Sequence, residues 1–471
     1  MKARKTENNR RTTGIHRAIP LLVGLLLAAR LEAASARTLS VDVLVVGGTP
    51  AGIAAATAAA RLGRRVHLVE PLPKLGGVIT WAWLTTFDMN LSPEGAHLTR
   101  GIFLEYYKRL GLSFDLDEAV DKLTWAVWRE PLVGSTTNAP LLRLLREGDR
   151  IAGAEFEDRD WQRTLVVRAK QVVDATDDAE LGAAAGVPYV LGKPGPDGKP
   201  WMQPATLIFR VRGVDWGRLV ADLLRRRAAG ADPARWGVNG KAAWGYPEMA
   251  QRYRPTQPQV GLLGLNLALQ NDGSVLVNAL QVYSVNGLDP ESTALGMERA
   301  RRELPHVVRH LREHVPGFEQ AELAGWAPML YIRETRHIRG LYTLTAEDIL
   351  RGRRFEDRIA LASYPIDIHP YVPGWANPYP PVRITYSIPL RSLIPLGMTN
   401  LLVASRSFSA TSEAAGSARV IPTTMAMGQA AGVVAAFCAR RGCTPTEVAR
   451  RTELLREVQR LLRAQGAYLG E

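Results

Sequence analysis

The sequence predicts an α/β fold: a parallel sheet with an inserted β-meander, plus a second, inserted α+β lobe. Three stretches support this prediction. Near the N-terminus, an apolar run (41–46) leads through a glycine turn into an alanine-rich helix. A second apolar run ends in Asp174-Ala175-Thr176, and a small-residue helix (428–437) follows a third run near the C-terminus. Because such pieces share one sheet and its covering helices, the chain must leave this domain and return to it.

The first stretch predicts a βαβ unit. Residues 41–46 have strand length, residues 51–62 form a helix that ends before Gly63, and residues 66–70 form a second strand. Within about 30 residues this order makes the two strands parallel and adjacent. The turn Gly47-Gly48-Thr49-Pro50-Ala51-Gly52 then directs backbone N–H groups and the positive end of a helix dipole at one point. A pyrophosphate is the natural occupant of that point.

This turn differs at one position from the G-x-G-x-x-G dinucleotide fingerprint. Thr49 stands where the second glycine is usual, and we expect its hydroxyl to donate to a phosphate oxygen. Glu70 ends the second strand, 23 residues after Gly47, where an acid accepts hydrogen bonds from ribose hydroxyls. The alternative is a βαβ unit that binds no nucleotide.

The middle of the first domain predicts a β-meander. Residues 141–173 alternate short apolar strands with polar turns. They lead to the sequence Asp174-Ala175-Thr176-Asp177-Asp178. Taken alone, this is equally an ordinary strand end before a helix.

Together with Leu75-Gly76-Gly77, these motifs resemble the FAD-dependent oxidoreductases of the glutathione-reductase-like fold. The turn from Gly47 to Gly52 is similar to a GGTPAG branch of exported or uncharacterised bacterial flavoproteins. The resemblance covers nearly all of the chain from residue 41 and implies a Rossmann-like FAD-binding domain. This chain departs from the family at two places. Asp177 stands where the family usually has glycine, and residues 81–88 contain less glycine than is usual in the family.

The resemblance implies where FAD binds. Gly76 and Gly77 would lie along its ribityl and diphosphate, and the N-terminus of the helix at 428–437 would favour the electron-rich N1/O2 edge of the reduced flavin. The implied FAD-binding residues are Gly47, Gly48, Thr49, Pro50, Ala51, Gly52, Glu70, Gly76, Gly77, Asp174, Ala175, Thr176, Asp178, Arg406, Gly428, Gln429, Ala430 and Gly432.

Residues 186–385 are predicted to form the substrate-binding lobe. Strand-like segments alternate with loops there, and a helical stretch at 293–314 is expected to kink or break at Pro305. We find no second glycine fingerprint, so no separate nicotinamide domain is predicted. The full division is a signal peptide at 1–36, an FAD-binding domain at 37–185 and 386–445, the lobe, and a C-terminal amphipathic helix within 446–471.

Four side chains are candidates for substrate contact: Arg336, Asp367, His369 and Arg419. Arg333 and Arg336 resemble the family's Arg-x-x-Arg-x-x-x-Gly segment; each either clamps a carboxylate or phosphate, or holds two loops together through backbone carbonyls. If Asp367 and His369 lie on a strand, both side chains share one face. His369 is then either a general acid or base beside the flavin, or a side chain packed among aromatics.

The N-terminus has the pattern of a signal peptide. A basic segment precedes a 12-residue apolar run at 18–29 and a small-residue cleavage site at Ala34-Ser35-Ala36. This predicts export and no stable membrane span after cleavage; an uncleaved anchor is the alternative. Arg10-Arg11 is compatible with the twin-arginine route.

Charge and cysteine content exclude several functions. Seven Lys/Arg against two acids give residues 1–36 a charge of +5, which leaves +8 of the total +13 for residues 37–471. These cations are scattered among acids, so no nucleic-acid partner is predicted. Two cysteines, Cys438 and Cys443, are too few for an iron–sulfur cluster or a structural zinc site, and no metal is predicted.

The predicted function is FAD-dependent oxidation or reduction of a small organic substrate, by hydride or electron transfer to or from the flavin, with an unknown electron acceptor or donor. Three alternatives remain. One is a flavin-dependent reductase fed by a protein electron donor. Another is a non-redox, carbohydrate-active exported protein, which needs two carboxylates about a sugar site. The third is a non-catalytic module that retains FAD.

Overall fold

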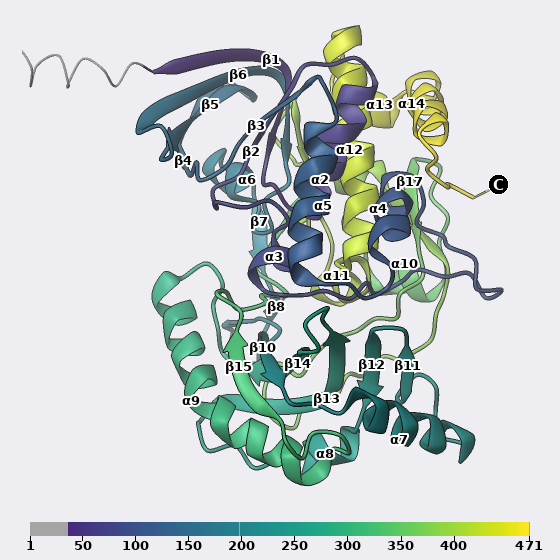
Figure 1. The fold of residues 1–471 in the computed structure, drawn as a ribbon. Helices are drawn as coiled ribbons and strands as arrows, with labels where there is room; N and C mark the ends of the chain where they lie inside the picture. The colour runs from purple at the N-terminus through teal and green to yellow at the C-terminus, as the bar shows by residue number, and fades with distance from the viewer. Residues whose placement is uncertain (1–35, 197, 471) are drawn as a thin grey trace, which may run out of the picture.

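The computed structural model describes residues 36–196 and 198–470, so the predicted signal peptide lies outside the described residues apart from Ala36. Two sheets divide the described chain into two lobes (Figure 1). The N-terminal strands, the helices α2 (Pro50–Arg61) and α12 (Ile421–Arg441) and the C-terminus build one lobe, and the middle of the chain, including α9 (Pro290–His314), builds the other.

A seven-stranded sheet forms the centre of the first lobe. Its strands are β1 (Arg37–Val46), β2 (Val66–Val69), β3 (Val133–Thr136), β4 (Leu141–Glu147), β5 (Arg150–Asp158), β6 (Arg163–Asp174) and β19 (Leu401–Val403). The order is β3-β2-β1-β6-β5-β4, with β19 also paired to β6. Neighbours from β3 to β6 are parallel, as is β19 with β6, whereas β4, β5 and β6 form an antiparallel meander. The predicted fold class is confirmed.

Register brings the ends of four strands together. Val46 at the end of β1 pairs with Asp174 at the end of β6, and Val403 at the end of β19 pairs with the same Asp174. Val46 also pairs with Val69 of β2. The glycine turn, Glu70 and the Asp-Ala-Thr motif therefore meet at one edge of the sheet, where ligands bind in open α/β folds.

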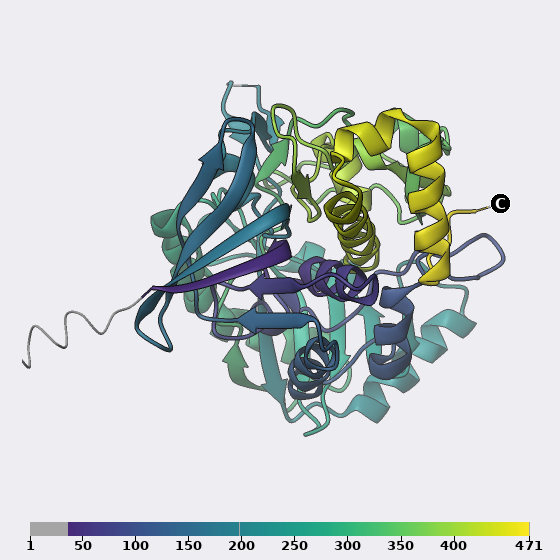
Figure 2. The ribbon, with the colours of Figure 1, turned by 90° about the horizontal axis from the view of Figure 1, so that it is seen from above.

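Two helices cover this sheet and pack directly against each other (Figures 1 and 2): α2 (Pro50–Arg61) and α12 (Ile421–Arg441). Glycine makes this contact possible. A Cβ at Gly428 would lie 2.0 Å from the Ala51 carbonyl oxygen, and one at Gly432 would lie 2.1 Å from that of Ala55. Among the described residues, α12 is also the helix long and apolar enough to span a membrane, but 94% of its apolar window is buried in this core.

Short elements complete the first lobe. They are α3 (Val78–Trp81), α4 (Ile102–Leu110), α5 (Leu116–Trp128), α6 (Glu180–Ala184), β7 (Tyr189–Leu191), β8 (Lys193–Pro194), β9 (Pro200–Trp201), β16 (Arg336–Ile338), α10 (Ala346–Leu350), β17 (Arg358–Ala362), β18 (Tyr386–Pro389), the 3₁₀ helix η1 (Leu390–Ser392), α11 (Ser412–Ala418), α13 (Pro445–Arg450) and α14 (Thr452–Ala464). The C-terminal segment is thus two helices separated at Arg451, not the single helix predicted.

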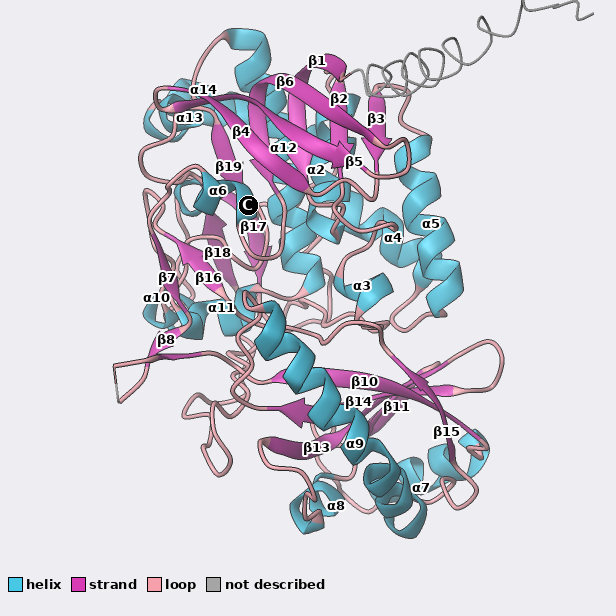
Figure 3. Cartoon of the chain, turned by 90° about the vertical axis from the view of Figure 1, so that its left-hand side faces the viewer, coloured by secondary structure: helices cyan, strands magenta, loops and turns pink. Residues whose placement is uncertain are grey.

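The second lobe is an antiparallel sheet covered by helices (Figure 3). Its strands, in spatial order, are β11 (Gly237–Asn239), β12 (Ala242–Gly245), β13 (Val260–Leu269), β14 (Val275–Val282), β10 (Ala205–Arg212) and β15 (Glu322–Trp326). Its helices are α7 (Trp216–Ala228), α8 (Pro247–Arg252) and α9 (Pro290–His314). The predicted break at Pro305 does not occur, because α9 continues through it with Leu304, Val307 and Leu311 buried in the lobe's core.

The inserted lobe is smaller than the predicted range 186–385. Its hydrophobic core is drawn from residues 205–330. Leu344, Phe355, Ile368 and Tyr371 instead pack into the core around α2 and α12. The chain therefore returns to the first lobe well before residue 386.

Candidate active site

Two adjoining cavities lie at the sheet edge described above. The large cavity has about 520 Å³ of accessible space and is lined by Gly47, Glu70 and Gly77 of the first lobe and by Pro290 and other residues of α9. The small cavity is much tighter, with about 30 Å³ of accessible space. Five residues line both cavities and make them continuous: Thr49, Val78, Asp177, Ile332 and Arg406.

Thr49 links the glycine turn to the Asp174-Ala175-Thr176 motif. Its hydroxyl accepts a hydrogen bond from the Gly52 N–H (3.2 Å), which caps α2, and donates one to the Ala175 carbonyl (2.8 Å). The hydroxyl proton is therefore used inside the protein. The expectation that it donates to a phosphate oxygen is wrong for this geometry.

Glu70 is buried at the end of β2, with 3% of its surface exposed, and lines the large cavity. Its carboxylate accepts from the backbone N–H of Gly48 (2.5 Å) and of Leu72 (2.9 Å). Burial raises the pKa of Glu70 to about 7; those two hydrogen bonds oppose the rise, and the nearby charges of Asp177 and Glu180 add to it. The carboxylate can accept hydrogen bonds from the hydroxyl groups of a sugar within the cavity.

Arg406 is the cation of the large cavity. It pairs with Asp178 (2.7 Å) and Asp177 (3.4 Å), yet its Nε is buried and has no hydrogen-bond partner among the described residues. Asp177, at the position where the resemblance expects glycine, lines both cavities, and burial raises its pKa. An anionic ligand here meets a positive charge and an unused N–H.

The predicted FAD-binding residues fall into two groups. Those that line a cavity are Gly47, Thr49, Pro50, Ala51, Glu70, Gly77, Thr176, Asp178 and Arg406. Those absent from both linings are Gly48, Gly52, Gly76, Asp174, Ala175, Gly428, Gln429, Ala430 and Gly432. Residues of the second group support the backbone next to the cavities. Asp174, for example, accepts hydrogen bonds from the N–H groups of Thr176 and Gly182 and so stabilises the turn after β6.

The helix near the C-terminus reaches the small cavity with its first turn, at Val420, Ile421 and Thr424. It begins at Ile421, seven residues before Gly428. Gly428 to Gly432 are therefore packing residues, and the prediction that they contact the cofactor does not match their position. Gln429 accepts from the Ile102 N–H and donates to the Gln465 carbonyl.

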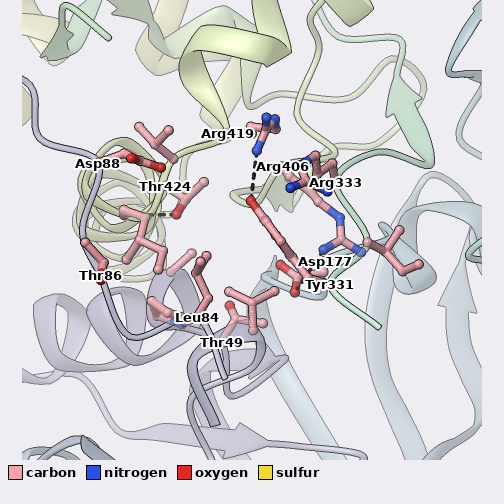
Figure 4. A pocket seen from close by; sticks show the side chains of 16 residues that line it. Thr49, Leu84, Thr86, Asp88, Asp177, Tyr331, Arg333, Arg406, Arg419 and Thr424 are labelled. Atoms are coloured by element: carbon pink, nitrogen blue, oxygen red, sulfur yellow. Dashed lines mark hydrogen bonds and ion pairs between the residues drawn. The ribbon is translucent and has the colours of Figure 1, made fainter. Parts of the chain in front are cut away.

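The far end of the small cavity is polar (Figure 4). The guanidinium of Arg419 donates to the Tyr331 hydroxyl (2.8 Å) and pairs with Asp367 (3.4 Å). Arg333 stacks on the Tyr331 ring, 4.5 Å from its centroid. Figure 4 shows Asp88 on the opposite side of the cavity from these arginines.

Asp367 and His369 lie behind Arg419 and are absent from both linings. They are in irregular backbone, not on the predicted strand, yet their side chains meet: His369 Nε2 is 3.3 Å from Asp367 Oδ2. Gln281 Nε2 lies 2.7 Å from His369 Nδ1, and the Tyr283 hydroxyl bonds to Gln281 Oε1. Because the amide nitrogen donates, Nδ1 is the acceptor and the ring proton is on Nε2, facing Asp367.

Burial, together with the charge of Arg333, lowers the pKa of His369 to about 4 against the opposing effect of Asp367, so the ring is neutral at pH 7. Burial opposes ionisation of Asp367, but His369 and Arg419 hold the pKa of that carboxyl well below its usual range. The pair is thus a neutral imidazole that donates to a carboxylate. That carboxylate in turn holds Arg419.

Sequence reasoning missed Asp88, Tyr331, Tyr364 and Thr424. Asp88 lines the small cavity; burial and the charge of Asp367 raise its pKa to about 6, and Tyr364 bonds to it. Asp88 ends the segment 81–88, whose departure from the family pattern was the available signal. The sequence signal for Tyr331 was weaker: it lies two residues before Arg333, which belongs to a motif of the family.

Arg336 is placed elsewhere. It donates to the Asp178 carbonyl (2.8 Å), stacks on Tyr189 and lines neither cavity. Of the two alternatives for this side chain, loop bridging matches its contacts, and substrate contact does not.

A family comparison agrees with this geometry. The model described as FAD dependent oxidoreductase matches residues 42–462. The chain belongs to this family. It is an FAD-dependent oxidoreductase, and its cofactor is FAD.

Curated relatives match only part of the chain. The digeranylgeranylglycerophospholipid reductase of Thermoplasma volcanium is 28% identical over 172 residues, which are 32% of this chain and 43% of that protein. The enzyme of the same name from Picrophilus torridus is 27% identical over 169 residues, 31% of this chain and 42% of that protein. The match therefore spans less than half of each relative.

Solved structures align over most of the chain at low sequence identity. A geranylgeranyl bacteriochlorophyll reductase-like protein of Thermoplasma acidophilum has a TM-score of 0.46 at 14% identity, covering 91% of this chain and 84% of its own. The p-nitrophenol 4-monooxygenase of Pseudomonas putida has a TM-score of 0.43 at 11% identity, with coverages of 92% and 90%.

The residues present fit FAD. The unused Nε of Arg406 and Thr49 at the N-cap of α2, which both line the two cavities, would suit the diphosphate, and Glu70 would suit ribose hydroxyls. The first turn of α12, at Ile421, places the positive end of a helix dipole at the small cavity, where it would suit the electron-rich edge of a flavin ring. With FAD held in this way, the large cavity would be the nucleotide end of the site, and the small cavity would adjoin the flavin ring.

Proposed function

We propose that this enzyme oxidises or reduces a small organic substrate in the small cavity, by hydride or electron transfer to or from the flavin. The observation that supports the proposal most is the two-sided lining of that cavity. Thr49, Pro50, Ala51 and Ile421 form the wall next to the nucleotide end, and a polar cluster that includes Asp88 and Arg419 forms the other. FAD supplies the two-electron redox chemistry when it is bound.

The polar cluster divides into positioning and proton-handling groups. Arg419 and the Tyr331 hydroxyl form one hydrogen-bonded unit that orients a polar group of the substrate. Asp88 holds or releases a proton near neutral pH, because its pKa is raised to about 6. The pair Asp367 and His369 acts through Arg419 and fixes its direction.

The experiment begins with the visible spectrum of the purified protein and the release of flavin by heat or acid. We expect a flavin spectrum and, in anaerobic titration with a panel of small organic donors, bleaching by those donors that are substrates. A colourless protein that cannot be reconstituted with FAD contradicts the proposal. Bound FAD that no donor or acceptor in the panel affects favours a non-catalytic module.

A reductase fed by a protein electron donor is the second candidate. It is favoured by the names of the two curated relatives, both of which are reductases. In this case the order of the titration is reversed: the flavin is first reduced chemically under anaerobic conditions. Reoxidation by an organic acceptor, without bleaching by any donor, supports this direction of reaction.

We further propose that the enzyme is exported, on the basis of the pattern in residues 1–36. Mass spectrometry of the mature protein from the native host tests this proposal. We expect an N-terminus at Arg37. An intact N-terminal segment on a membrane-bound protein supports the uncleaved anchor instead.

A further inference from the structure

Arg333 is a buried cation that lacks an acidic partner. Only 4% of its surface is exposed, and no carboxylate of the described chain lies within the 4.0 Å of an ion pair. Asp88 and Asp367 act on it only from longer range. Burial, together with the charge of Arg419, lowers the pKa of Arg333 to about 10 against the opposing effects of Tyr331, Asp367 and Asp88, and the guanidinium stays charged at pH 7.

Within the part of the chain that the structure describes, hydrogen bonds are found at only one nitrogen of this guanidinium. Nη1 donates to the Pro204 carbonyl (2.8 Å) and to the Thr206 hydroxyl (2.7 Å), which anchors the side chain to the second lobe. Nε is buried without a partner, and no bond to Nη2 is found within residues 36–196 and 198–470. The edge formed by Nε and Nη2 is the fork that binds a carboxylate through two parallel hydrogen bonds.

The other cations of the small cavity are already paired. Arg406 is held by Asp177 and Asp178, and Arg419 is held by Asp367. Arg333 lines the same cavity and stacks on the Tyr331 ring. The hydroxyl of Tyr331 accepts a hydrogen bond from Arg419. Arg333 is therefore the guanidinium of this cavity that lacks an ion pair among the described residues, and Asp88 offsets its charge only from longer range. An unpaired buried charge is unfavourable, and a bound anion supplies the missing partner.

We propose that the substrate of this enzyme carries a carboxylate, which binds to the free edge of Arg333 beside Tyr331 and Arg419. The inference rests on the proposed function, because it assigns the substrate class of the same cavity. Anchoring to Pro204 and Thr206 pre-organises the guanidinium, so little side-chain freedom is lost when the anion binds.

The experiment uses matched probes on the full, FAD-loaded chain. Benzoate is compared with benzamide, and acetate with acetamide, because each pair differs chiefly in charge. Binding is followed by calorimetry and by the visible spectrum of the bound flavin. We expect each carboxylate to bind about 10 to 100-fold more tightly than its amide, as charge-assisted hydrogen bonds imply.

Two variants and one control make the result specific. Arg333→Met removes the preference for carboxylates, and Arg333→Lys retains part of it because the charge stays while the fork is lost. Arg212→Met is the control: this arginine is exposed on the same strand as Thr206, pairs with Glu322 and leaves the preference unchanged. Unchanged Tm and flavin content show that each variant is folded.

Failure of the inference is distinguishable from failure of the proposed function. Equal binding of acid and amide by protein whose flavin is bleached by a donor overturns the carboxylate assignment alone. A preference that survives in Arg333→Met also overturns it. Protein that binds no FAD overturns the proposed function before any probe is added.

Discussion

At the scale of single residues, the small cavity has one acid that changes charge near neutral pH. The pKa of Asp88 is raised to about 6 by burial and by Asp367, while Arg419, Arg383 and the hydrogen bond from Tyr364 partly oppose the rise. A bound carboxylate repels ionised Asp88 but not its neutral form. Binding of an anionic ligand is therefore coupled to uptake of a proton by Asp88.

We predict that benzoate binding weakens about tenfold between pH 5 and pH 7 as Asp88 loses its proton. The direction follows because the protonated fraction of a group with a pKa of about 6 falls about tenfold over that interval. Asp88→Asn should bind benzoate with a nearly constant affinity. Calorimetry across this pH range checks both expectations, and a variant as pH-dependent as the parent protein would remove Asp88 from this role.

His369 is a positioning residue, since it reaches the cavity only through Asp367 and Arg419. We predict that His369→Ala slows flavin reduction by an active donor by up to about 100-fold, the cost of misplacing a substrate-orienting group. The bound-flavin spectrum should stay intact. His369→Asn, which keeps an N–H donor, should recover part of the rate. Unchanged reduction kinetics in His369→Ala would contradict the assignment.

At the scale of elements, the contact between α2 and α12 decides the shape of the site. Both helices present their first turns to the small cavity, at Ala51 and at Ile421. Their backbones approach closely because Gly428 and Gly432 have no side chain. The small-residue pattern read from the sequence is real, and the surface it contacts is another helix.

We predict that Gly428→Ala destabilises the protein by about 1–3 kcal/mol, because the new methyl group would meet the Ala51 carbonyl and force the helices apart. The variant should also bind FAD more weakly, since Ala51 lines the cavity. Gly217→Ala on α7 is a matched control: its Cβ would meet only Asp215, at 3.4 Å, and alanine favours a helix. Thermal unfolding and FAD titration compare the two variants. Equal Tm values would contradict the packing argument.

The elements were predictable from sequence because their signals are local. The βαβ unit, the meander and the return of the chain to the sheet each follow from periodicity and glycine placement. The polar cluster was only partly predictable. Asp367 and Arg419 were recognised, but their contact joins an irregular loop to the end of α11, and Tyr331 lies on yet another loop. Thr49 and Gln429 show the same limit, since their partners are set by tertiary packing.

At the scale of the whole molecule, the two lobes enclose a cavity with several acidic side chains at its nucleotide end. Burial raises the pKa of both Glu70 and Glu180 to about 7. Such groups favour the folded state when protonated. Their stabilising effect is complete below the ordinary pKa near 4.5 and is lost as the pH rises through about 7.

We therefore predict that the Tm of the FAD-free protein falls between pH 5 and pH 8, with Glu70 contributing up to about 3 kcal/mol to the loss. The Tm of Glu70→Gln should fall less steeply with pH. The Tm of Glu291→Gln, in which an exposed residue of α9 is changed, should follow that of the parent protein. Because ribose hydroxyls donate to ionised Glu70, bound FAD should lower its pKa and flatten the curve of the parent protein but not that of Glu70→Gln. Circular dichroism melts of the three proteins, with and without FAD, measure these curves. Equal flattening in both proteins would place the ribose away from Glu70.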